Sequence, residues 1–238
     1  MKHLFNTLAV IAMVAMLQTT AFGKDDKTVV SDTTNTYTDV EWVDLGLPSG
    51  LLWAKCNLGA TSPYEYGGHY AWGETWTKSA YSWASYIHSN GESNKLTKYC
   101  CRSSEGSFGY KGFLDKLTTL QPADDAATAK LGNGARIPTY NDWIELMTNT
   151  SSEWTTLHGT KGMLFTAPNG NTLFLPAAGA YVESSCAYRG EGAYYWSSSL
   201  FTGMPESAWT SFFNEDDAGL IDAERCEGRS VRPVRSAK

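Results

Sequence analysis

The densest acidic group of the chain lies near its C-terminal end. Asn214-Glu215-Asp216-Asp217 is followed shortly afterwards by Asp222 and Glu224. Calcium takes roughly six to eight oxygen ligands from such loops, so the segment is a candidate calcium site, the one cofactor considered for this chain. The same charges would attract a basic partner, and a solvated turn explains the same residues without any ligand. We leave these three alternatives open and treat the following as candidate ligand-binding residues: Asn214, Glu215, Asp216, Asp217 and Asp222.

Aromatic and arginine side chains are concentrated beside this acidic group. Trp, Tyr and Arg dominate binding sites because they bury much area and keep a polar group, and flat rings stack on sugar faces. Packing within the fold is the alternative interpretation. Trp196 and Phe212 are assigned to the core by strand alternation. The candidate contact residues are Tyr188, Arg189, Tyr194, Phe201, Trp209 and Arg225.

The histidines do not form a catalytic signature. His69, His88 and His158 are scattered, without a His-Glu-x-x-His pair or a Gly-x-Ser-x-Gly nucleophile motif. Gly132-Asn133-Gly134 lacks the remaining glycine of a dinucleotide-binding loop and is interpreted as a turn. The sequence therefore favours a protein that is not an enzyme.

Charge argues against nucleic acid as a partner. The chain of 238 residues has a formal net charge of −6, with acidic and basic residues interspersed. A phosphate-binding surface needs clustered Lys and Arg, and none is visible. Strand alternation divides Arg229, Arg232 and Arg235 between two faces, and we expect Arg232 to be held inside by a carboxylate or by carbonyls.

The N-terminus has the three parts of a secretory signal peptide. Lys2 gives a basic start, Leu4 to Leu17 is largely apolar, and small residues end the segment at Ala21-Phe22-Gly23. Neither this run nor any later one is long enough to span a bilayer. We expect a monomeric protein exported to the periplasm, the outer surface or the medium. Its expected organisation is a signal peptide at 1–23, a flexible lead-in at 24–39 and one domain at 40–238.

Export permits disulfide bonds, but the cysteine count is odd. The chain has five cysteines, so at least one thiol is left over and the connectivity is not determined by the sequence. Cys186 with Cys226 is the preferred pair, because it would join the start of the C-terminal region to its last loop. Buried free thiols are the alternative.

The first half of the chain predicts a strand pair followed by a long irregular segment. Val40–Asp44 alternates as a half-buried strand does, and a Pro-Ser-Gly turn leads to a partner at Leu51–Ala54. From Glu74 to Leu120 no period is sustained. We expect a surface excursion pinned by Trp76, Trp83, Tyr99 and Phe113.

Two helices are predicted. Asp124 and Asp125 precede Ala126–Leu131, where an acidic side chain can cap free backbone N–H groups, and Gly132 ends the segment. Thr139–Asp142 resembles a capping box that starts a second helix. The apolar face of this second helix is expected to comprise Tyr140, Trp143, Ile144 and Met147.

Strands are predicted for most of the remaining chain. An Asn-Gly pair between Met163–Ala167 and Thr172–Ala177 is a strong hairpin signal. Gly192–Leu200, Ala208–Phe213 and Arg229–Arg235 read as three further strands separated by two polar loops. Binding residues concentrate on loops that rigid strands carry. The pattern predicts an α+β fold with mixed or antiparallel sheets, two short helices and long loops.

Five blocks of this sequence resemble the Fibrobacter succinogenes major paralogous domain family, whose exported members are common in Bacteroidetes. They occur in the same order and cover nearly all of the chain after the signal peptide. The blocks are Val43–Glu74 (VDLGLPSGLLWAKCNLGATSPYEYGGHYAWGE), Asp124–Met147 (DDAATAKLGNGARIPTYNDWIELM), Asn169–Gly179 (NGNTLFLPAAG), Tyr194–Leu200 (YYWSSSL) and Arg229–Arg235 (RSVRPVR).

The family is similar to C-type-lectin-like folds, in the branch of the formylglycine-generating enzyme and the variable proteins of diversity-generating retroelements. The resemblance implies N- and C-terminal strands that pair, and a ligand surface on the C-terminal loops that diversification could vary. Two departures stand out. The enzyme uses two nearby cysteines, whereas Cys186 and Cys226 are forty residues apart, and the calcium-binding triplets of sugar-binding lectins are absent.

The sequence as a whole predicts a non-catalytic, exported binding domain that contacts a protein or a glycan through loops between Tyr188 and Arg225. Two other hypotheses compete with it. One is an oxidase of the formylglycine-generating type, and the other is a structural subunit or tip of a surface assembly.

Overall fold

Strands dominate the folded part of the chain. The computed structural model describes residues 40–101 and 114–237, so the expected signal peptide (1–23), the lead-in (24–39) and Phe113 lie outside the described residues. Within this part, the helices are α1 (Ala126–Leu131), α2 (Tyr140–Asn149) and a short 3-10 helix η1 (Trp83–Ser85). The strands are β1 (Trp42–Asp44), β2 (Leu51–Ala54), β3 (His69–Tyr70), β4 (Ser151–Leu157), β5 (Thr160–Thr166), β6 (Thr172–Pro176), β7 (Ala180–Val182), β8 (Ser185–Ala187), β9 (Ala193–Leu200), β10 (Ser207–Phe213), β11 (Ala218–Glu224), β12 (Arg229–Ser230) and β13 (Val234–Ser236).

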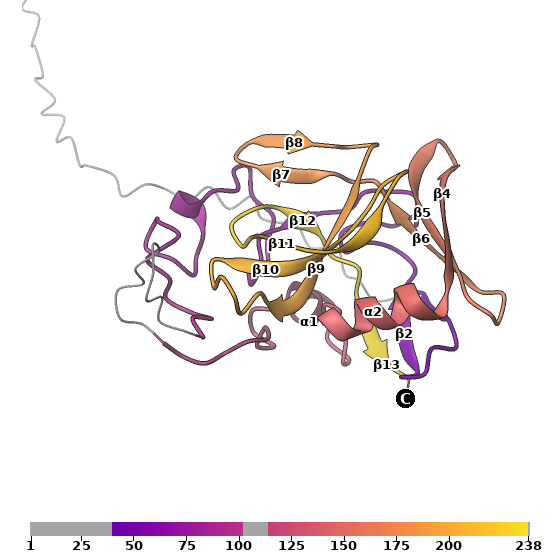
Figure 1. Cartoon of the computed structure of the whole chain (residues 1–238), viewed down its shortest axis with the longest axis horizontal. Coiled ribbons are helices and arrows are strands. Elements are labelled where there is room, and N and C mark those ends of the chain that lie inside the picture. Colours follow the sequence, from indigo (N-terminus) through magenta and orange to yellow (C-terminus); the bar gives the residue numbers. More distant parts are fainter. Residues whose placement is uncertain (1–39, 102–113, 238) are drawn as a thin grey trace, which may run out of the picture.

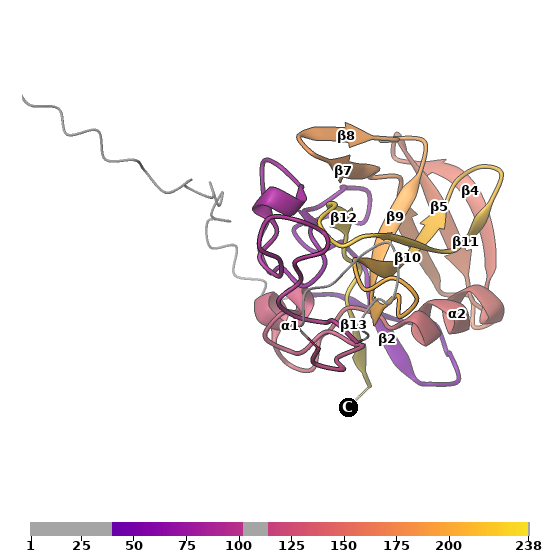
Figure 2. The ribbon, with the colours of Figure 1, turned by 60° about the vertical axis from the view of Figure 1, so that its left-hand side comes forward.

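The described strands form four sheets, which confirms the predicted α+β class (Figure 1). The largest has the order β11-β10-β9-β12-β3 and is mixed, because β12 runs parallel to β9. The others are β1-β2-β13, β4-β5-β6 and the β7–β8 hairpin, which stands at the top of Figure 2. The predicted Asn-Gly hairpin is the β5–β6 pair. No helix among the described residues is long and apolar enough to cross a membrane.

The C-terminal region contains a strand, β11, that the sequence does not predict. β9 and β10 match the predicted strands, but the polar segment expected to be a loop up to Arg225 contains β11, paired with β10 along its whole length. Its sequence, Ala218–Glu224, has few β-branched or aromatic residues, and pairing with β10 overrides this weak propensity.

The predicted strand Arg229–Arg235 is divided between two sheets. β12 pairs with β3 and β9, and the chain then crosses to β13, which pairs with β2. Trp53 at the centre of β2 is in register with Val43 on one side and Val234 on the other. The C-terminal strand therefore joins the N-terminal sheet, but its partner is β2 rather than the expected segment Val40–Asp44.

Arg232 lies in the connection between these two sheets. Its guanidinium is fully buried and donates hydrogen bonds to the carbonyls of Ala54, Lys55 and Phe174 and to Asn57 Oδ1. The expectation that carbonyls hold it inside is confirmed. Because these acceptors come from distant segments, Arg232 joins the N-terminal strands to β6.

Both predicted helices begin at the caps that the sequence indicates. Asp125 Oδ1 accepts from the Thr128 N–H group, and Thr139 forms a capping box with Asp142. The apolar face of α2 differs from the prediction. Ile144 is 37 % exposed, while Leu146 is fully buried. Leu146 lies three residues after Trp143 and shares its inward face.

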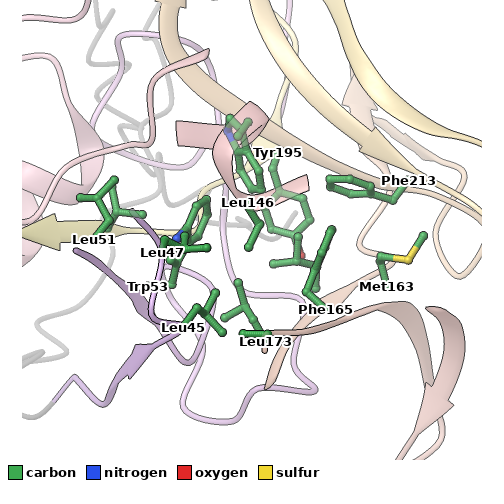
Figure 3. Packing of buried hydrophobic residues seen from close by; sticks show 14 of the residues in the cluster. Leu45, Leu47, Leu51, Trp53, Leu146, Met163, Phe165, Leu173, Tyr195 and Phe213 are labelled. Carbon is green, nitrogen blue, oxygen red and sulfur yellow. The ribbon is translucent and has the colours of Figure 1, made fainter. Parts of the chain in front are cut away.

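The main core lies between α2, the β1-β2-β13 sheet, strands β5 and β6, and one face of β9 and β10 (Figure 3). The Trp143 ring is 4.9 Å from that of Trp53 and 5.9 Å from that of Tyr195. Phe213 of β10 packs edge-on against Phe165 of β5. Fully burying each such ring contributes about 1.5–3 kcal/mol, so these contacts fix the sheet relative to α2.

A second buried cluster covers part of the opposite face of β9. It contains Trp196 and receives Tyr99 from the long segment after β3. That segment is largely irregular, as predicted. Trp83 is half-buried but packs against Tyr86 and bonds to Glu224, while Trp76 is half-buried. Tyr81 and Tyr86 also hold the segment, because both rings are buried and their hydroxyls donate to the backbone carbonyls of His69 and Trp72.

Candidate ligand-binding site

Three aromatic side chains form a chain of ring contacts on β9, β10 and the turn before them. Tyr194 of β9 is in register with Phe212 of β10, and their rings stack with centroids 6.5 Å apart. Tyr188 precedes β9, and its ring is 6.0 Å from that of Tyr194. Tyr188 is 60 % exposed, and the other two are half-buried. We call Tyr188, Tyr194 and Phe212 the aromatic strip.

The aromatic strip begins where the second buried cluster, which covers part of this face of the sheet, ends. Trp196 has the same orientation on β9 as Tyr194 and is fully buried in the second cluster. Arg229 marks the boundary, because its guanidinium lies 5.3 Å from each of these two rings. On the outer side, Gly219 of β11 stands opposite Phe212 and has no side chain to cover the ring. The apolar face of the sheet therefore extends past the second buried cluster to Tyr194 and Phe212, which are only half-buried.

Exposed carboxylates lie at the same end of the sheet as the aromatic strip. Phe213 of β10 pairs with Ala193 of β9, which places the β10–β11 turn next to the turn that precedes β9. The pKa of the Tyr194 hydroxyl is raised, mainly by burial. Arg229 lowers this pKa, while Tyr188 and Glu191, both in the turn before β9, raise it. We call this group the acidic rim: Glu191, Glu215, Asp216 and Asp217.

Asn214 holds the β10–β11 turn in shape. Its Oδ1 accepts hydrogen bonds from the backbone N–H groups of Asp216, at 2.9 Å, and Asp217, at 2.7 Å. This is an Asx turn, in which a side-chain oxygen replaces a backbone acceptor. The conformation of the turn therefore depends on Asn214, while the carboxylates around it stay exposed.

Arg189 is adjacent to the aromatic strip but contacts other rings. Its guanidinium lies 5.4 Å from the Tyr66 ring and 5.9 Å from the Tyr181 ring, and Nη2 is 3.5 Å from the Tyr181 hydroxyl. Arg229 is engaged in a different way, because its Nη2 donates to Glu227 Oε2 at 2.5 Å. Both cations near the strip therefore already have partners.

Phe201 and Trp209 lie away from the aromatic strip. Trp209 is three residues from Phe212 on β10, so alternation places it on the opposite face of the sheet. Its ring packs 4.8 Å from Phe201 and 4.7 Å from Tyr140 at the start of α2. Asp222 of β11 is in register with Trp209. Phe201, Trp209 and Tyr140 form a second, more closely packed aromatic group at the other end of β9 and β10.

Arg225 is not available to a ligand, and its assignment as a contact residue is wrong. The side chain is fully buried. Its guanidinium donates to the backbone carbonyls of Lys98, Tyr99 and Pro205 and to the Tyr86 hydroxyl. Rings of the second cluster surround it, with Trp72 at 5.0 Å. Arg225 thus ties the long irregular segment to the end of β11.

The acidic group divides in the structure. Asp222 and Glu224 belong to β11 rather than to a loop, and the Glu224 carboxylate accepts from the Trp83 indole N–H at 3.1 Å. Among the described residues, no three His, Cys, Asp or Glu side chains converge as a metal site would require. Calcium binding remains a prediction from the sequence.

Cys186 and Cys226 each keep a free thiol, so the preferred pair is not formed. Cys186 Sγ lies 3.5 Å from the Ala178 carbonyl, and Cys226 Sγ lies 3.7 Å from Glu224 Oε2. Burial and the neighbouring Glu224 and Glu227 raise the pKa of the Cys226 thiol, which keeps it protonated.

Two buried histidines stabilise the scaffold in their neutral form. His69 Nε2 is 3.2 Å from the Ala178 carbonyl, and burial lowers the pKa of His69 to about 4. His88 Nε2 is 2.9 Å from the Gly73 carbonyl, and burial lowers its pKa as well. Both rings therefore act as neutral hydrogen-bonding groups near pH 7.

The sequence missed one member of the aromatic strip. Phe212 was assigned to the core, but Phe213 fills that role and Phe212 faces outward. Two consecutive phenylalanines on one strand must face opposite ways, which was the available signal. Deciding between them required the register with β9, where Phe213 pairs with the buried Ala193.

No family model, no curated protein and no solved structure matches this chain. The family resemblance carried by the five sequence blocks therefore stays a prediction.

Proposed function

We propose that this chain is a non-catalytic, exported binding domain that recognises a protein or a glycan through the aromatic strip and the acidic rim. The observation that carries the proposal is the position of Tyr188, Tyr194 and Phe212 on an apolar sheet face that extends past its cover. Exposed aromatic surface bordered by polar groups is typical of interaction sites. Strands and an Asx turn support it, so it is preorganised for binding.

We further propose a C-type-lectin-like arrangement for the domain. The pairing of β13 with β2 supports it, because the resemblance implies terminal strands that meet. The placement of aromatic and acidic side chains on C-terminal hairpins agrees with the ligand surface that the same resemblance implies.

Binding arrays test the proposed function. The labelled protein is applied to a glycan array and to a protein array, alongside a variant with Tyr188→Ala and Phe212→Ala. A matched control carries Phe201→Ala and Met204→Ala in the connection between β9 and β10, where Met204 is exposed. We expect the first variant to lose the bound spots and the control to keep them, with both melting as single transitions. Equal binding by both variants would refute the site.

A further inference from the structure

The negative charge of this protein is concentrated around the C-terminal hairpins. Between Glu183 and Gly228 there are nine carboxylates and two arginines, and the rest of the chain is close to neutral. Of the two arginines, Arg225 is fully buried and Arg189 is stacked on Tyr66 and Tyr181. Stacking leaves the charge of Arg189 in place, so the surface around the aromatic strip carries this one exposed cation against the four exposed carboxylates of the acidic rim.

Arg229 does not change this balance. It is 6 % exposed, and its guanidinium is paired with Glu227 at the edge of the second cluster. Burial lowers the pKa of Arg229 while the Glu227 charge raises it. The pair is neutral overall, so the field at the strip is set by the acidic rim.

Aromatic rings beside exposed carboxylates bind cations by two additive effects. The negative face of each ring attracts an ammonium or guanidinium group, and nearby carboxylates add a Coulomb attraction and hydrogen-bond acceptors. Tyr188, Tyr194 and Phe212 extend over two neighbouring strands, and the rim supplies several charges along one end of the sheet. This extent suits a chain with several basic side chains better than a single small cation.

We propose that the aromatic strip and the acidic rim bind a lysine- and arginine-rich segment of a partner protein. This inference rests on the proposed function and names its partner class. Basic side chains would lie across the rings and reach Glu191, Glu215, Asp216 and Asp217. The rim offers neutral glycans hydrogen-bond acceptors but no charge complementarity, because these glycans carry no positive charge.

The test measures binding of a fluorescent oligolysine peptide and of the same peptide with its lysines acetylated, which removes the charge. Three forms of the full chain are compared with the native protein. The rim variant carries Glu191→Gln, Glu215→Gln and Asp216→Asn, and leaves Asn214 to hold the turn. The ring variant carries Tyr188→Ala alone, because this side chain is 60 % exposed and its loss spares the fold. The charge control carries Glu41→Gln, Glu92→Gln and Glu153→Gln.

We expect the dissociation constant for oligolysine to rise about tenfold in the rim variant, about threefold to tenfold in the ring variant and less than about twofold in the charge control. Binding should weaken as salt rises from about 50 to about 300 mM, and acetylated oligolysine should bind poorly throughout. Equal weakening by the rim variant and the charge control would show that only net charge matters, and would overturn the inference.

Array binding by the aromatic variant and the rim variant distinguishes failure of the basic-partner inference from failure of the proposed function. If the Tyr188 and Phe212 substitutions abolish the array binding but the rim variant keeps it, the proposed binding function stands for the aromatic strip alone. The role of the rim and the basic partner are then both refuted. Binding confined to neutral glycans also refutes the basic partner. If the aromatic substitutions leave every interaction unchanged, both proposals fail.

Discussion

The two ends of the β9-β10-β11 hairpins carry aromatic residues of the same kinds but use them differently. At the closed end, near Leu200 and Ala208, the buried Arg225 donates to three backbone carbonyls, and Trp209 packs between Phe201 and Tyr140. At the open end, near Ala193 and Phe213, the aromatic strip lies uncovered beside the acidic rim. Residue type alone does not distinguish the closely packed end from the proposed binding end, because the difference lies in which segments pack over the sheet.

Replacing Arg225 should have the largest effect on stability. Arg225→Met leaves three buried carbonyls and the Tyr86 hydroxyl without a donor, at about 1–3 kcal/mol for each unsatisfied group. We expect a loss of at least about 3 kcal/mol in unfolding free energy, measured by urea denaturation. The control Arg189→Met, at the open end, should change it by less than about 0.5 kcal/mol. Similar losses in both variants would contradict the division into closed and open ends.

Acid should lower the unfolding free energy through the buried His69. The pKa of His69 is about 4 in the folded chain, below the ordinary value near 6.5, so the unfolded chain takes up the proton first as the pH falls. The stability that neutral His69 contributes is present above about pH 6.5 and is lost toward pH 4. Between pH 7 and pH 5 the loss should be on the order of 2 kcal/mol.

His69→Gln is the control for this pH dependence, because the amide can still donate to the Ala178 carbonyl and does not titrate. Urea denaturation at both pH values should show a smaller loss in this variant than in the native chain. An identical pH dependence would show that other groups, such as His88, account for it.

One aromatic substitution at each end of β9 and β10 should distinguish a side chain that stabilises the fold from one that is exposed to solvent. Trp209→Ala removes contacts with Phe201 and Tyr140 and should cost about 1–2 kcal/mol, seen as a lower melting temperature. Tyr188→Ala should change stability by less than about 0.5 kcal/mol, because the side chain is mostly exposed. A larger loss for Tyr188 would mean that the aromatic strip is structural.

The smallest effect is expected within the β10–β11 turn. Asn214→Ala removes the acceptor of two backbone N–H groups and should cost about 0.5–1 kcal/mol. Glu215→Gln should leave the melting temperature unchanged, since Glu215 is exposed and Asn214 holds the turn. Equal melting of both variants would show that the Asx turn does not stabilise this end.

Much of the scaffold could be predicted from local sequence. The caps at Asp125 and Thr139, the β5–β6 hairpin and the strands β9 and β10 depend on residues close together in the chain. The carbonyl partners of Arg232 were also predictable, because a buried guanidinium needs acceptors. The proposed binding surface was predicted less well, since β11 has weak strand propensity and exists through its pairing with β10.

The sequence by itself determined the α+β class, both helices and a C-terminal region rich in aromatic and acidic residues, because these follow from short-range pattern and composition. Only the tertiary structure decided which of those residues are exposed. Arg225 and Tyr188 looked alike as candidates, yet long-range contacts with Tyr86 and Tyr99 bury the first, while the second lies beyond the cover. Exposure depends on which distant segment packs over a strand, and no local pattern contains that information.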